Sequence, residues 1–153
     1  MLEICFYAEK RSLEPDDLSF HRWRTICAAF GVDRCFIIDA TGMREHLTNK
    51  LDNLPCEAFI VDDFNEIDNG NPHVFVDKDV PLNREAIPFY AYDPPADVMY
   101  CFGGDHCGMQ QAWHEQETDQ PGDWITVPCD SPLWADQAAA IVLAYRNVIH
   151  ADT

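Results

Sequence analysis

The sequence has few basic residues and no long apolar run. Its 153 residues include 10 Lys and Arg against 27 Asp and Glu, so the formal net charge is −17. A protein that coats nucleic acid needs a basic surface, and this composition argues against that class. No apolar run approaches the roughly 18–20 residues that span a bilayer. Acids and bases also stand where a signal peptide needs its apolar segment. We therefore expect a soluble, cytoplasmic protein without a membrane partner.

The composition is that of a folded protein. Hydrophobic residues make up 47% of the chain and aromatic residues 12%, which is too apolar for a disordered acidic segment. At this length we expect a single domain over residues 1–153.

The negative charge is distributed unevenly. Residues 1–50 hold eight acidic and seven basic residues, whereas residues 51–153 hold 19 acidic residues and only Lys78, Arg84 and Arg146 as basic ones. A surface that meets phosphate is therefore expected in the first third of the chain. The alternative, which the charge alone favours, is a solubilising acidic shell with ordinary surface arginines.

The cysteines do not indicate disulfides or a metal. There are seven, an odd number, and most lie inside apolar runs, which indicates buried free thiols in a reducing compartment. Cys101 and Cys107 are spaced C-x5-C, which matches no common zinc pattern, and the sequence has no C-x-x-C. We expect no metal site.

Short apolar runs alternate with amphipathic segments along the chain. Apolar residues at i, i+3, i+4 and i+7 predict helices, and short β-branched or aromatic runs predict strands. Ser131 is expected to cap the last helix, with Pro132 in its first turn and Leu133, Ala140, Leu143 and Ala144 on its apolar side. The expected strands are Glu3–Ala8, Cys35–Asp39, Ala58–Val61, 73–77, 89–92, Val98–Phe102 and Trp124–Val127. The expected helices are Asp16–Phe30, with Gly31 as its stop, Met43–Leu54, Gly108–Glu117 and Leu133–Ile149.

Strands separated by helices predict an α/β domain with a mainly parallel sheet and helices on both faces. Ligands bind at the carboxyl ends of strands in such sheets. Two strand ends meet this description. One runs into CFGGDHCG (101–108), where glycines let the backbone approach a ligand. The other is ITVPCDSPLW (125–134), which leads into a helix.

Three segments together resemble a known family. AAFGVDRCFIID (28–39), DVMYCFGGDHCG (97–108) and WITVPCDSPLWADQAAAIVLAYR (124–146) are similar to the three signature regions of the SPOUT superfamily, SpoU (TrmH-like) branch. The members of this branch are RNA 2′-O-methyltransferases that use S-adenosylmethionine. The resemblance implies an α/β domain with a C-terminal trefoil knot, a homodimer, and an RNA substrate, most plausibly a tRNA ribose. The implied cofactor-binding residues are Gly103, Asp105, Gly108, Ile125, Val127, Pro128 and Leu133.

The sequence departs from the family at the catalytic positions. Trp134 stands at the family's Asn, Pro132 at its Ser, and Asp105 at its Glu. No arginine falls in the first region's Arg position, and Arg24 and then Arg22 are the candidates that flank it. Asp105 completes the candidate catalytic set. His21 could accept a proton, because imidazole titrates near neutral pH. Arg22 and Arg24 could equally belong to a solvated helix face, and a lone His on such a helix is more often structural or merely exposed.

Two alternatives remain open at this stage. The first is a catalytically degenerate SPOUT-fold protein that binds S-adenosylmethionine or a protein partner without methyl transfer. The second is an unrelated small α/β enzyme or metal protein that uses Asp105, His106 and Cys107.

Overall fold

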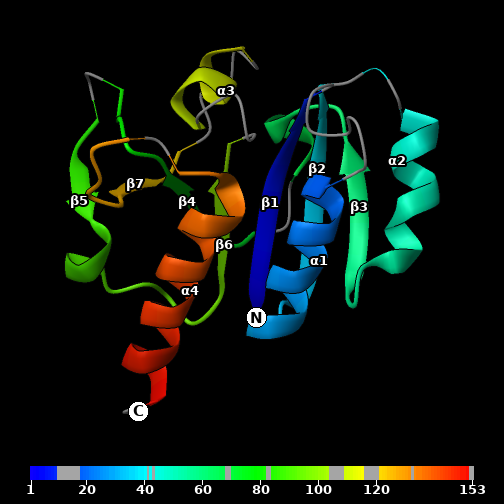
Figure 1. The fold of residues 1–153 in the computed structure, drawn as a ribbon. Helices are drawn as coiled ribbons and strands as arrows, with labels where there is room; N and C mark the ends of the chain where they lie inside the picture. Colours follow the sequence, from blue (N-terminus) through cyan, green and yellow to red (C-terminus); the bar gives the residue numbers. More distant parts are fainter. Residues whose placement is uncertain are drawn as a thin grey trace.

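The computed structural model describes residues 1–9, 18–40, 42, 44–67, 70–81, 84–103, 109–115, 121–131 and 133–151. Seven strands form one sheet in the order β3-β2-β1-β6-β4-β7-β5. Every neighbouring pair is parallel, and Figure 1 shows the strands side by side across the view. The predicted mainly parallel α/β sheet is confirmed. The strands are β1 (Leu2–Glu9), β2 (Arg34–Ala40), β3 (Glu57–Val61), β4 (His73–Val76), β5 (Ala86–Pro88), β6 (Val98–Phe102) and β7 (Asp123–Thr126).

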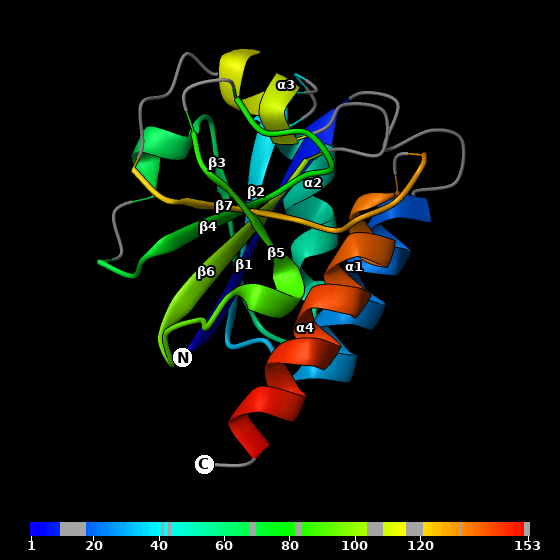
Figure 2. The same cartoon turned by 90° about the vertical axis from the view of Figure 1, so that its left-hand side faces the viewer.

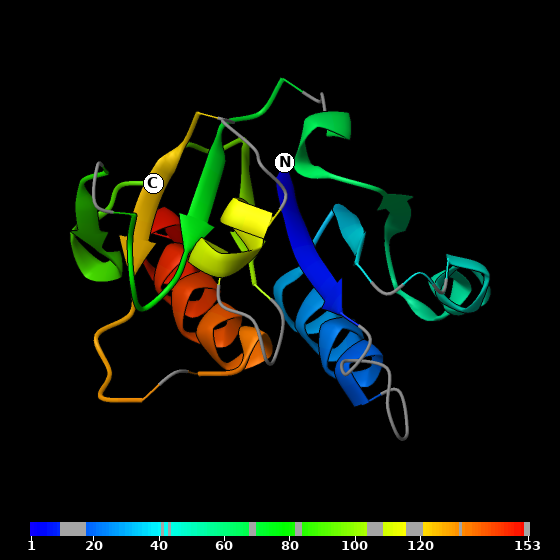
Figure 3. The same cartoon turned by 90° about the horizontal axis from the view of Figure 1, so that it is seen from above.

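Helices cover both faces of the sheet. Helices α1 (Leu18–Phe30) and α4 (Ala135–Ala151) lie side by side on one face, and α3 (Met109–Glu115) lies on the other. Helix α2 (Arg44–Lys50) lies beside β3 at the edge of the sheet (Figures 2 and 3). Single 3₁₀ turns at Leu51–Asn53 (η2), Phe64–Glu66 (η3) and Phe89–Ala91 (η4) complete the described elements.

Helix α1 forms where the sequence pattern predicts it. Trp23, Ile26 and Cys27 are buried against the sheet, and Trp23 stacks on Phe6 of β1 with ring centroids 5.0 Å apart. Gly31 ends the helix with a φ of 62°, a left-handed conformation that glycine adopts without a steric cost. The Val32 N–H donates to the Cys27 carbonyl at 3.1 Å, which is the longer hydrogen bond of a Schellman motif.

Two apolar clusters form the core, one on each face of the sheet. Because side chains alternate along a strand, β1 contributes Ile4 and Phe6 to the α1 and α4 face and Cys5 and Tyr7 to the α3 face. The six cysteines among the described residues all have free thiols. Four of them are buried: Cys5, Cys27, Cys35 and Cys101. No helix among the described residues is both long enough and apolar enough to cross a membrane.

The prediction of a strand at residues 89–92 is wrong. The strand β5 precedes this segment and ends at Pro88, and residues 89–91 form a 3₁₀ turn in which the Tyr92 N–H donates to the Phe89 carbonyl at 3.4 Å. The aromatic rings there pack against α4 rather than in the sheet: Phe89 and Tyr145 meet edge to face at 5.4 Å.

The predicted start of the last helix is also wrong. Helix α4 begins at Ala135, so Ser131 is not its cap, and Pro132 lies outside the described residues. Gln137 satisfies the start of the helix instead, because its side-chain oxygen accepts from the Trp134 N–H at 3.0 Å. The buried side of the helix consists of Ala135, Ala139, Val142 and Leu143, whereas Ala144 of the predicted side is exposed.

Candidate functional site

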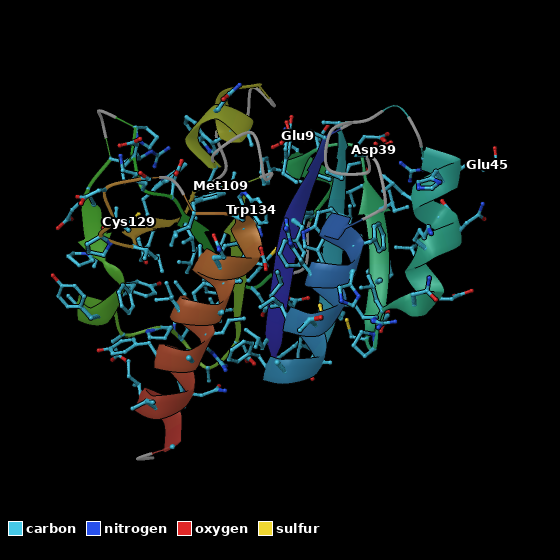
Figure 4. The ribbon with its side chains drawn as sticks, viewed as in Figure 1. Glu9, Asp39, Glu45, Met109, Cys129 and Trp134 are labelled. Carbon is cyan, nitrogen blue, oxygen red and sulfur yellow. The ribbon has the colours of Figure 1, made fainter. Side chains whose placement is uncertain are left out.

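The strand order reverses at β1. The chain places β2 and β3 on one side of β1 and then crosses to the other side, where β4 and β5 form first and β6 later fills the position between β1 and β4. In open parallel sheets a ligand binds outside the carboxyl ends of the strands at such a reversal. We call the edge at which β1, β6 and β7 end the carboxyl edge. Figure 4 shows Glu9, Asp39, Met109 and Trp134 at this end of the molecule.

The first strand end at the carboxyl edge is that of β6. Strand β6 ends at Phe102, and Gly103, the next residue, is buried. The next described residue along the chain is Met109, whose side chain is 1% exposed and lies in the core of the α3 face. Gly103 is therefore a predicted site residue that the structure places at this edge, while Asp105 and Gly108 lie outside the described residues.

The second strand end at the carboxyl edge is that of β7. Ile125 and Val127 are buried in the core of the α1 and α4 face, and Leu133 is half-buried against the same core. Pro128 is exposed. The Cys129 thiol donates to the Val127 carbonyl at 3.3 Å, a local hydrogen bond within the segment after the strand. The structure thus brings the predicted residues of this loop to one place, with apolar walls and an irregular backbone.

Ile125 also faces a small hollow beneath α4. With Tyr100 and Val142 it lines a pocket to which Phe89 of η4, Tyr92 and Tyr145 of α4 contribute aromatic rings. Burial raises the pKa of Tyr100 to about 12, and the nearby Arg146 charge opposes that shift. The Ile125 side chain therefore lies in the protein interior, beneath the carboxyl edge.

Trp134 lies at the start of α4 and reaches toward α1. Its main chain is held at both ends, because its N–H donates to Gln137 and its carbonyl accepts from the Ala138 N–H at 3.1 Å. The side chain is 43% exposed. The Arg22 guanidinium carbon lies 3.5 Å from the centroid of the Trp134 ring, which is cation–π stacking distance.

The two candidate arginines occupy different environments. Arg22 is half-buried and stacks on Trp134, whereas Arg24 is exposed on α1, beside the buried Trp23. His21 is exposed as well, and its carbonyl accepts from the Thr25 hydroxyl at 3.0 Å. The structure therefore brings Arg22 into contact with Trp134, at the entry to α4.

Acidic residues surround this edge. Glu9 and Asp39 lie at the ends of β1 and β2, and Asp77 follows β4. The Asp77 carboxylate accepts from the Lys78 N–H at 2.7 Å. These acids were not among the residues predicted for the site. Each lies at or directly after the end of a strand, and that position indicates a ligand site in a parallel sheet. Among the described residues no group of His, Cys, Asp or Glu could hold a metal ion, and Asp105, His106 and Cys107 lie outside them.

The comparisons with known proteins identify the fold. No protein-family model and no curated protein sequence matches this chain. Among solved structures, the SpoU methyltransferase AviRb from Streptomyces viridochromogenes, determined with AdoMet, matches all of the chain with a TM-score of 0.67 and 16% identity, over 62% of its own length. The A. aeolicus TrmH/SpoU tRNA-modifying enzyme matches 98% of the chain with a TM-score of 0.66 and 17% identity, over 77% of its own length.

A third similar structure is the AdoMet-bound rRNA methyltransferase from Sinorhizobium meliloti, which matches 97% of the chain with a TM-score of 0.65 and 12% identity, over 56% of its length. The chain spans less than two thirds of the length of this protein and of AviRb. It has the fold of the SpoU-type RNA methyltransferases, and the resemblance read from its three sequence segments is confirmed at the level of the fold.

Proposed function

We propose that this chain is an S-adenosylmethionine-dependent methyltransferase that acts on RNA. The observation that carries the proposal is the convergence of the end of β6, the end of β7 and the start of α4 at the carboxyl edge of a SpoU-type fold. Two proteins with this fold, AviRb and the Sinorhizobium meliloti enzyme, were determined with AdoMet. A tRNA ribose 2′-hydroxyl is the specific acceptor that we propose.

The residues at the carboxyl edge fit the chemistry of this cofactor. An adenosine needs apolar walls and main-chain N–H and C=O groups that read its base. Val127 and Leu133 provide such walls, Gly103 has no side chain to keep a ligand from its backbone, and the segment after β7 has irregular backbone. We propose that these residues hold the cofactor with Ile125, Pro128, Asp105 and Gly108. The bound cofactor supplies a methyl group on a positively charged sulfur.

The chain's own contribution to methyl transfer is to align the acceptor and to favour loss of its proton. Alignment of the two reacting atoms at about 3–3.5 Å accounts for much of the rate in such reactions. An arginine can hold the phosphate beside the acceptor and stabilise the developing oxyanion. Arg24 is exposed and available for an incoming phosphate, and Arg22 lies at the loop before α4. We assign this role to Arg24 and Arg22, with Asp105 as a third candidate.

Calorimetry with S-adenosylhomocysteine tests the cofactor site. Leu133→Ala removes three carbon atoms of a half-buried wall, and loss of about 1–3 kcal/mol of apolar contact predicts roughly 5- to 150-fold weaker binding. Leu51→Ala removes the same atoms from a half-buried residue of η2, away from the carboxyl edge, and is the matched control. No heat of binding for the unaltered protein at millimolar ligand would refute the proposal.

Transfer of a tritiated methyl group from S-adenosylmethionine to bulk tRNA tests the activity itself. We expect incorporation by the unaltered protein and its loss in Arg24→Ala. Incorporation into base rather than ribose would contradict the proposed acceptor while leaving the methyltransferase assignment intact.

We also propose the homodimer and the C-terminal knot that accompany this fold in the family. Exposed apolar residues on α4 support a dimer contact: Ile141 is 38% exposed and Val148, seven residues later, is 65% exposed. Light scattering should give the mass of two chains for the unaltered protein and of one chain for Val148→Glu. A monomer in both samples would contradict the dimer.

A second candidate function is a protein that binds the cofactor, or a protein partner, without methyl transfer. Trp134 favours it, because its indole occupies the position of the family's Asn and contacts Arg22. Binding of S-adenosylhomocysteine without methylation of any RNA would select this candidate.

A further inference from the structure

Trp134 is the most exposed tryptophan among the described residues. Trp23 and Trp124 are 2% and 1% exposed, and Trp113 is half-buried, whereas Trp134 is 43% exposed. Its main chain is fixed by the hydrogen bonds that start α4, and it lies at the carboxyl edge (Figure 4). A rigidly presented aromatic ring next to a proposed cofactor site offers a surface for a planar ligand.

Arg22 gives this ring a defined orientation. Its guanidinium carbon is 3.5 Å from the ring centroid, so the charged plane covers one face of the indole, and Arg22 itself is half-buried. Arginine planes and aromatic rings are the groups on which proteins stack unpaired nucleobases. The two side chains come from different helices, α1 and α4, which pack side by side on the same face of the sheet.

The charge of this edge favours contact through a base over contact through phosphates. Residues 51–153 carry 19 acidic and three basic residues, and Glu9 and Asp39 lie at the ends of neighbouring strands. An acidic surface repels the phosphate backbone. Stacking on an aromatic ring needs no net positive charge, because every base has a π face.

We propose that Trp134, held by Arg22, is the stacking platform for an unpaired base of the RNA substrate. This inference rests on the proposed function and adds to it the class of substrate: an RNA with unpaired nucleotides at the modification site, rather than a continuous duplex. Trp134 is a positioning residue, since it contacts a base that is distinct from the reacting hydroxyl, and Arg22 orients its ring.

Fluorescence anisotropy with three labelled RNAs tests the proposal: a short single strand, a hairpin with an unpaired loop, and a perfect duplex. Removing a stacking aromatic costs about 1–3 kcal/mol, so Trp134→Ala should weaken binding of the single strand and the hairpin about 5- to 150-fold. Trp134→Phe keeps an aromatic ring and should recover most of the affinity. Arg22→Lys keeps the charge without the planar group and should weaken binding. Tyr90→Ala removes an aromatic side chain that is 56% exposed on η4 and should leave the affinity unchanged.

The salt dependence and the cofactor affinity give independent readouts. Each phosphate of a single strand that the protein neutralises contributes roughly −0.7 to the slope of log affinity against log salt concentration. Stacking with few phosphate contacts therefore predicts a shallow slope of about −1 to −2. S-adenosylhomocysteine affinity should be equal in the unaltered protein and Trp134→Phe. The stacking proposal is overturned by any of three results. These are equal RNA affinity in Trp134→Ala and the unaltered protein, a preference for the duplex, or no RNA binding at all. S-adenosylhomocysteine binding would then still stand as a separate test of the proposed function. Loss of cofactor affinity in Trp134→Ala with unchanged RNA affinity would assign the ring to the cofactor's adenine and would likewise overturn it.

Discussion

The buried carboxylate of Glu3 makes the stability of the sheet depend on one arginine. Glu3 is fully buried in β1, at the end of the sheet opposite the carboxyl edge. The Arg34 Nε atom of β2 lies 2.7 Å from a Glu3 carboxylate oxygen, and the Asn71 side-chain amide donates to the other oxygen. We predict that Arg34→Ala strongly destabilises the protein, because it leaves the negative charge buried without its cation.

The expected magnitude follows from the burial of the two partners. Breaking a buried ion pair by removing one partner costs about 3–5 kcal/mol. The Arg34 side chain is 28% exposed and Asn71 still donates to the carboxylate, so we expect the lower end of that range. Glu3→Gln keeps the shape of the side chain and removes the charge, and its cost should be about 1 kcal/mol.

Urea unfolding at neutral pH measures these costs. A loss of about 3 kcal/mol corresponds to a midpoint lowered by about 1–2 M urea for a typical slope. The double variant Glu3→Gln, Arg34→Ala should be more stable than Arg34→Ala alone, because no charge is left buried. Additive costs in the double variant would show that the Glu3 charge is not destabilising without Arg34. S-adenosylhomocysteine affinity of the folded variants should equal that of the unaltered protein, since the proposed site lies at the opposite edge.

Three further predictions concern the core and its pH dependence. Trp23→Ala removes a ring that is 2% exposed and stacks on Phe6, so calorimetric or urea unfolding should show a loss of about 3–5 kcal/mol. Gly122→Ala should lower the thermal midpoint strongly, because a Cβ there would lie 2.6 Å from the His73 carbonyl oxygen and 2.7 Å from the Phe75 ring; an unchanged midpoint would contradict the packing before β7. Burial lowers the pKa of His73 below its ordinary value of 6.5, and the nearby Glu3 charge opposes this. The unfolded chain then takes up a proton before the folded protein does, so stability should fall as the pH falls below about 6.5, and His73→Gln should flatten that fall in urea midpoints measured between about pH 7 and pH 5.

The sequence predicted the fold well where one local pattern decides the structure. Val98–Phe102 has the predicted bounds because a short, continuous apolar run that ends at glycines is typical of a strand buried on both faces. Gly31 ends α1 because a positive φ requires it. The aromatic run at 89–92 was wrongly predicted as a strand. The β propensity of aromatic residues depends on packing within a sheet, and the Phe89 ring packs on Tyr145 of α4 instead.

The candidate site was predictable in its location but not in its contacts. The ends of β6 and β7 could be placed at one edge because parallel strands share a direction. Ser131 and Pro132 gave a plausible local helix start, yet Gln137, inside the helix, makes the hydrogen bond that fixes the observed start at Ala135. The stacking of Arg22 on Trp134 joins residues far apart in the sequence, and only the packing of α1 against α4 brings them together.

A crystal structure of the protein soaked with S-adenosylhomocysteine would show whether the cofactor binds at the carboxyl edge. We expect the adenine between Gly103 and the loop from Val127 to Leu133, with the sulfur directed toward the α1 side, where Arg22 and Trp134 lie. A ligand bound elsewhere, or a soaked crystal in which this edge is unchanged and holds no ligand at saturating concentration, would contradict it.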